Sequence, residues 1–218
     1  MVRPSASPTL VDENGWDADS VDGSTRDTIE GTATATPRAV ILVEGVSDRR
    51  ALEALAARRG RVLTDDGVTV VAMDGAGNIG RFLDAYGPSG SDVALAGLYD
   101  AAEEQAVRRG LERAGFGSVG SRHELERLGF YACIEDLEDE LIRALGADRV
   151  MEIVDERGEL GPFRTLQKQP GWRERPTEEQ LRRFLGNSSR KIDYAPVLVD
   201  ALDLSKVPRP LDAVLAHV

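Results

Sequence analysis

This sequence of 218 residues has little of several residue types, and each shortage excludes a class of protein. A single cysteine, Cys133, excludes an internal disulfide, and its apolar neighbours predict a thiol in the core. No apolar stretch approaches the roughly 20 residues that span a membrane, and the amino terminus lacks the layout of a secretory signal. We therefore expect a soluble, cytoplasmic protein without a membrane partner.

Two further shortages concern chemistry. The only histidines, His123 and His217, stand in polar or terminal surroundings, which favours surface positions over roles as metal ligands. The sequence has no Gly-x-x-x-x-Gly-Lys-Ser/Thr phosphate loop, so it does not predict ATP hydrolysis by this chain.

Composition divides the chain into three parts. Residues 1–37 have too little apolar surface to offset chain entropy, which predicts a disordered acidic tail. Residues 38–146 alternate strand-like and helix-like segments and predict an α/β domain. Residues 147–218 have no further strand pattern, which predicts a helical extension packed on that domain.

Four apolar segments, 40–43, 67–74, 93–100 and 129–136, predict buried strands. Helical patterns lie between them, and Ser47 is the expected N-cap of the first helix. Alternating strands and helices with short connections are typical of a mostly parallel sheet flanked by helices. The expected fold class is therefore α/β, with a small sheet.

Carboxylates end each of these predicted strands: Glu44, Asp74, Asp100, and Glu135 with Asp136. Because parallel strands joined by helices end at the same edge of a sheet, these acids are expected to meet. Asp48, in the first turn of the first helix, adds another. Such carboxylates repel one another unless a proton or cation lies between them, and their oxygens suit Mg²⁺ or Mn²⁺. A pair of these ions can hold the attacking and leaving oxygens of a phosphodiester.

Three segments resemble, in order, the motifs of the Toprim domain shared by topoisomerases, bacterial primases and OLD-family nucleases. They are Leu42-Val-Glu-Gly-Val-Ser-Asp48, Leu95-Ala-Gly-Leu-Tyr-Asp-Ala-Ala-Glu-Glu104 and, for the OLD-type branch, Asp136-Leu-Glu-Asp-Glu-Leu141. The resemblance covers roughly residues 38–145. It implies an endonuclease that acts on DNA phosphodiesters with two Mg²⁺ or Mn²⁺ ions. By motif, Glu44 would be a metal ligand or general acid/base, with further metal ligands Asp48, Asp100 and Glu138.

The second motif departs from the family at its second aspartate. The common Asp-x-Asp is here Asp100-Ala-Ala102, so Glu103 or Glu104 would have to substitute. Glu103 stands at capping-box spacing from Asp100, and Glu104 is therefore the preferred metal ligand. The missing aspartate leaves an alternative open, namely a catalytically degenerate scaffold that partners a separate ATPase subunit.

A basic segment, residues 160–191, lies in the helical extension although the whole chain has a net charge of −11. Its excess of basic side chains predicts contact with the DNA backbone, and a solvated helical face is the alternative. Trp172 is a candidate for stacking on a base. The resemblance also implies a basic residue near the metals, and Lys191 is the candidate catalytic residue. The predicted DNA-binding side chains are Arg164, Lys168, Arg173, Arg175, Arg182, Arg183 and Arg190.

Two non-catalytic interpretations remain. Asp136 has the position of an N-cap for a helix over residues 137–145, and Glu138 that of an acid favoured by the helix dipole. Gly75-Ala-Gly-Asn-Ile-Gly80 matches the Gly-x-Gly-x-x-Gly of dinucleotide-binding proteins, with Asp100 twenty residues further on. Such matches are common by chance in a chain with 22 glycines, and this interpretation gives Glu44 no role.

Overall fold

The computed structural model describes residues 36–218, which form one compact unit. The prediction of an acidic tail over residues 1–37 falls outside this part of the chain, apart from the last two residues. No helix among the described residues is long and apolar enough to cross a membrane.

Four parallel strands form one sheet in residues 36–218, in the order β2-β1-β3-β4. They are β1 (Ala39–Val43), β2 (Val68–Ala72), β3 (Ala94–Asp100) and β4 (Phe130–Cys133). All five residues of β1 are buried, because this strand lies inside the sheet and both of its faces are covered. The predicted α/β class with a small parallel sheet is confirmed.

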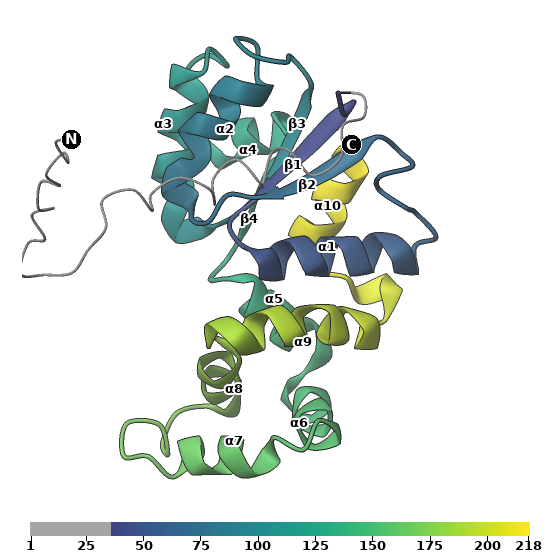
Figure 1. The fold of residues 1–218 in the computed structure, drawn as a ribbon. Helices are drawn as coiled ribbons and strands as arrows, with labels where there is room; N and C mark the ends of the chain where they lie inside the picture. Colours follow the sequence, from purple (N-terminus) through teal and green to yellow (C-terminus); the bar gives the residue numbers. More distant parts are fainter. Residues whose placement is uncertain (1–35) are drawn as a thin grey trace, which may run out of the picture. The chain divides into compact units, whose positions relative to one another are not determined.

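Helices cover both faces of the sheet (Figure 1). Val40 and Leu42 face a cluster shared with α2 (Ile79–Tyr86), α3 (Glu104–Arg113) and α4 (Arg122–Arg127). Ile41 and Val43 face the opposite cluster, which is shared with α1 (Val46–Arg58), α5 (Leu137–Leu145), α9 (Ser188–Ala201) and α10 (Arg209–His217). Alternate residues of β1 therefore serve two separate cores.

Three further helices, which lie away from the sheet in Figure 1, extend the second cluster. They are α6 (Ala147–Glu156), α7 (Leu160–Gln167) and α8 (Thr177–Leu185). The 3-10 turns are η1 (Ala76–Asn78), η2 (Ala101–Glu103) and η3 (Leu204–Lys206).

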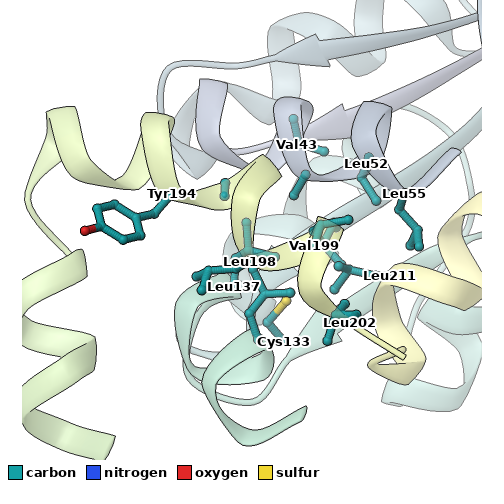
Figure 2. Close-up of a cluster of buried hydrophobic side chains, with 14 of the residues drawn as sticks. Val43, Leu52, Leu55, Cys133, Leu137, Tyr194, Leu198, Val199, Leu202 and Leu211 are labelled. Atoms are coloured by element: carbon teal, nitrogen blue, oxygen red, sulfur yellow. The ribbon is translucent and has the colours of Figure 1, made fainter. Parts of the chain in front are cut away.

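Helix α9 packs along α1, and this contact joins the carboxyl-terminal helices to the sheet. Figure 2 shows Val199 of α9 on the side of Leu52 and Leu55 of α1, whereas Leu198 lies nearer to Leu137 of α5. Cys133, at the end of β4, is buried in the same cluster, as its apolar neighbours predict. The shared core fixes the position of α9, and hence of Lys191 near its start, relative to the first turn of α1.

The structure corrects the expected start of the first helix. The N-cap of α1 is Gly45, whereas Ser47 lies inside the helix and is buried. The reason is Asp48, whose carboxylate accepts a hydrogen bond from the backbone N–H of Gly45 (2.8 Å).

Candidate metal centre

A cavity of about 440 Å³ lies where the strands end, and we call it the acid cavity. One basic side chain, Lys191, lines it together with six carboxylates: Glu44, Asp48, Asp74, Asp100, Asp136 and Glu138. Four of the five predicted metal ligands and the predicted catalytic lysine are thus brought together. Their metal-binding and catalytic roles stay predictions.

The sheet itself positions two of these acids. Glu44 directly follows β1 and Asp100 is the last residue of β3, and the two strands are parallel neighbours, so both side chains reach the same edge. Asp74 follows β2 and also lines the cavity, with a left-handed backbone (φ 56°). The sequence offered the same strand-end signal for Asp74 as for Asp100, but the family motifs do not include it.

Asp100 is the N-cap residue of η2, yet its side chain makes no capping hydrogen bond. The capping-box interpretation of Asp100 and Glu103 is therefore wrong. The carboxylate of Asp100 is left facing the acid cavity.

Asp48 and Asp100 are held in conditions that disfavour their charged forms. Burial, and then the neighbouring carboxylates of Glu138 and Glu44, raise the pKa of Asp48 to about 6 against the opposing hydrogen bond from Gly45. Burial, followed by the charges of Glu44 and Asp48, raises the pKa of Asp100 to about 7. The acid cavity therefore holds more carboxylates than its one lysine, Lys191, can neutralise.

Glu138 and Lys191 form an ion pair across the acid cavity. The Nζ of Lys191 lies 3.1 Å from Oε2 of Glu138, while the buried Oε1 of Glu138 has no hydrogen-bond partner in residues 36–218. Burial raises the pKa of Glu138 despite this pair. Burial, the largest single influence, would lower the pKa of Lys191, but the charge and hydrogen bond of Glu138 together with the charges of Asp136 and Asp48 outweigh it, and the pKa is raised. Lys191 is therefore a fixed positive charge at the acid cavity.

Asp136 is the N-cap of α5, as one interpretation of the sequence had it. It accepts a hydrogen bond from the backbone N–H of Asp139 (2.8 Å). Its other oxygen lies 2.8 Å from Nε of Arg182, which also pairs with Glu135 (3.2 Å). Both oxygens of Asp136 are thus engaged within the protein.

The fifth predicted metal ligand, Glu104, does not line the acid cavity. Its carboxylate pairs with Arg108, one turn further along α3, and with Nη2 of Arg122 at 2.7 Å. These two guanidinium groups lower the pKa of Glu104 although burial opposes them. The spacing of Arg108 from Glu104 is visible in the sequence, but the approach of Arg122 is not.

The donor set of the acid cavity fits a hard divalent cation. As the side chains stand, no group of three or more His, Cys, Asp or Glu residues in the described part of the chain is arranged to hold an ion. The lining nevertheless offers carboxylate oxygens, raised carboxyl pKa values and the unpartnered Oε1 of Glu138. Each of these features is relieved by a bound cation.

Ion pairs engage most of the basic segment. Arg173 pairs with Glu174, Arg175 with Glu179, Arg182 with Asp136, and Arg190 with Glu159. Among the described residues, Arg164, Lys168 and Arg183 form no ion pair with a carboxylate, and all three are exposed. The surface free to meet a phosphate backbone is therefore smaller than the sequence indicates.

The topology does not fit the dinucleotide-binding interpretation. In such a unit the strand before the glycines and the strand that carries the acid are neighbours. Here Gly75 follows β2 and Asp100 ends β3, and β1 lies between these two strands. Asn78, within the glycine segment, donates to the carbonyls of Met73 and Asp74 and so ties this turn to the end of β2.

Comparisons with known proteins agree with this architecture. Residues 37–96 match the family of Overcoming lysogenization defect protein-like (OLD-like) Toprim domains. The resemblance to OLD-family Toprim proteins is confirmed. The matched range includes Glu44 and Asp48, while Asp100 and Glu138 lie beyond it. No curated protein matches the chain by sequence.

Two solved structures of OLD proteins share the fold. The carboxyl-terminal region of the OLD protein of Xanthomonas campestris pv. campestris aligns with a TM-score of 0.65 and 22% identity, covering 83% of this chain and 91% of that one. The corresponding region from Burkholderia pseudomallei aligns with a TM-score of 0.59 and 19% identity, covering 83% and 96%. Both alignments extend well beyond the residues matched by the family, so the likeness of fold includes much of the carboxyl-terminal helices.

Proposed function

We propose that this chain is a metal-dependent endonuclease that cleaves DNA phosphodiesters at the acid cavity. The observation that carries the proposal is the convergence of Glu44, Asp48, Asp100 and Glu138 on one cavity with Lys191. Glu44 follows β1, and the other residues come from α1, β3, α5 and α9. Carboxylates from separate elements repel one another when they meet, and a shared cation offsets this repulsion.

The protein groups would divide the work as follows. Glu44, Asp48, Asp100 and Glu138 would hold two Mg²⁺ or Mn²⁺ ions, which supply the positive charge that stabilises a phosphodiester during displacement. Glu44, directly at the end of β1, could also accept or donate a proton. Lys191 lies beside Glu138 and would offset negative charge that develops on the phosphate. Glu104 is left out of this ligand set because Arg108 and Arg122 engage it.

A non-enzymatic function is the second candidate. Ala102 stands where the family has its second aspartate, and Glu104 does not replace it in the acid cavity. A scaffold of this kind would bind the metal ion and a separate ATPase subunit without cutting DNA.

Nicking of supercoiled plasmid with Mg²⁺ or Mn²⁺ separates these candidates. The endonuclease requires metal-dependent nicking that Glu44→Gln reduces by roughly 100-fold or more, the scale of a lost general acid/base. Glu53→Gln is the matched control, because Glu53 lies on α1, is exposed and loses the same charge. Metal binding without nicking, together with co-purification of an ATPase, supports the scaffold.

A further inference from the structure

A second cavity, of about 510 Å³, adjoins the acid cavity, and we call it the tryptophan cavity. Asp136 and Lys191 line both cavities, so the two spaces meet at these residues. Ligand pockets generally range from about 300 to 1,000 Å³, so this space is large enough for part of a bound molecule. Its other wall is formed by Trp172, in the turn between α7 and α8, and by Arg183 of α8.

Trp172 is placed where it can meet a ligand. It is half-buried, and the guanidinium of Arg183 lies 5.8 Å from the centre of its ring. A ring that is neither enclosed in the core nor fully exposed offers a stacking surface, and the guanidinium that lies over this ring adds attraction for a phosphate.

The turn that carries Trp172 is held by a buried amide. Gln180 is 4% exposed, and its Nε2 donates to the backbone carbonyls of Trp172 (2.7 Å) and Arg175 (3.0 Å). Its Oε1 accepts a hydrogen bond from Nε2 of Gln167 (2.7 Å), at the end of α7. Because every partner is inside the protein, the turn is fixed relative to both helices and the ring is preorganised.

The acids on the wall of the tryptophan cavity are largely neutralised. Arg182 pairs with Glu135 and Asp136, while Glu179 pairs with Arg175 and Asp139 with Arg143. In residues 36–218, Arg183 has no carboxylate partner and remains free to meet an anion. Glu178 is the remaining acid of the lining.

From this arrangement we infer that the tryptophan cavity is a subsite for an unpaired nucleobase. The base stacks on Trp172, Arg183 contacts its phosphate, and the adjoining strand continues past Lys191 into the acid cavity. A base inside a duplex is already stacked on both faces, so only an unpaired or extruded base can take this position. The inference rests on the proposed function and narrows its substrate to DNA with single-stranded character.

Tryptophan fluorescence gives a direct test. The chain has two tryptophans, and Trp16→Phe makes Trp172 the sole reporter. Oligo(dT) is titrated in Ca²⁺, a cation that oxygen ligands also bind, and strand binding is followed in parallel by anisotropy of a labelled strand. Binding should quench Trp172, whereas the same strand paired to oligo(dA) should bind without quenching.

Variants at the ring supply the second measurement. Trp172→Ala should weaken binding of oligo(dT) by roughly 5- to 150-fold, the value of one stacked base, with little effect on the duplex. Trp172→Phe should retain most of the affinity, because it keeps an aromatic face. Gln169→Ala is the matched control, since Gln169 is an exposed residue of the same turn. Circular dichroism verifies that each variant is folded.

These results distinguish this subsite from the proposed nuclease activity. If the protein nicks plasmid but Trp172→Ala binds oligo(dT) as tightly as the parent, the subsite is overturned and the nuclease stands. Strand binding without quenching overturns it as well. If oligo(dT) quenches Trp172 and no cleavage occurs with Mg²⁺ or Mn²⁺, the subsite is supported and the nuclease proposal fails.

Discussion

Lys191 of α9 lies 3.1 Å from Glu138 of α5, and both side chains line the acid cavity. The two residues are 53 positions apart, and they meet because α9 and α5 pack in the same core. A carboxylate buried to 4% exposure needs a positive partner, and Lys191 provides it in the absence of a metal ion.

Replacing Lys191 tests the importance of this ion pair. Lys191→Met should destabilise the metal-free protein by about 1–3 kcal/mol, because Glu138 is left buried without a partner, and partial exposure of the lysine weakens the effect. Urea unfolding measures the change. Lys191→Arg is the control that keeps the positive charge, and an equal loss in both variants would show that packing, not charge, is responsible.

The raised pKa values predict how the stability of the metal-free protein depends on pH. Asp48 and Asp100 have pKa values of about 6 and about 7, against an ordinary value of 3.8. Between pH ~4 and ~7 the folded protein therefore binds more protons than the unfolded chain, and its stability falls as pH rises through this range. Added Mg²⁺ or Mn²⁺ should restore stability, most strongly at and above pH ~7.

Thermal unfolding across this pH range, with and without metal, checks the prediction. In the double variant Asp48→Asn/Asp100→Asn, the loss of stability with rising pH and the stabilisation by added metal should both be smaller. A metal-free protein that becomes more stable from pH ~4 to ~7 would contradict it.

Substitution of Glu104 tests which set of metal ligands is right. The set predicted from the sequence includes Glu104, and the structure leaves it out. Glu104→Gln should leave metal-dependent nicking unchanged but lower stability by about 1–2 kcal/mol, because Arg108 and Arg122 lose their charged partner. Asp100→Asn should abolish nicking instead. Loss of nicking in a folded Glu104→Gln protein would return Glu104 to the metal site.

The close packing around Gly97 predicts that a larger residue at this position destabilises the protein, without involving the acid cavity. A Cβ atom at this position of β3 would lie 2.5 Å from Cδ1 of Phe130 and 3.3 Å from the carbonyl oxygen of Leu42. Gly97→Ala should therefore cost about 1–3 kcal/mol of stability, measured by urea unfolding. Adding Phe130→Leu to Gly97→Ala should cost less than the sum of the two single changes, since the smaller side chain removes the clash.

The sequence predicted the sheet well because its strands are buried on both faces. Such strands are nearly continuous apolar runs, and their carboxyl ends share an edge whatever the details of packing. For that reason the positions of Glu44 and Asp100 followed from the order of strands and helices alone. The place of Lys191 came from the family resemblance, since nothing local indicates that α9 returns to the sheet.

Other features depend on contacts between residues far apart in the chain. Arg122 reaches Glu104 across 18 positions and Arg182 reaches Asp136 across 46, so neither pair is visible in the sequence. The start of α10 is a local feature by contrast: Pro208 precedes the helix and Pro210 lies in its first turn, where a proline is tolerated. Helix α4 also has a local start signal, because Ser121 and Glu124 form a capping box there.

The most direct test of the account is the position of Mn²⁺ in crystals of the protein, located by anomalous diffraction. Manganese peaks are expected in the acid cavity, about 2.0–2.2 Å from carboxylate oxygens of Glu44, Asp48, Asp100 or Glu138. Manganese peaks only at other carboxylates, or no peak at all in crystals where the acid cavity is accessible to solvent, would contradict the proposed metal site.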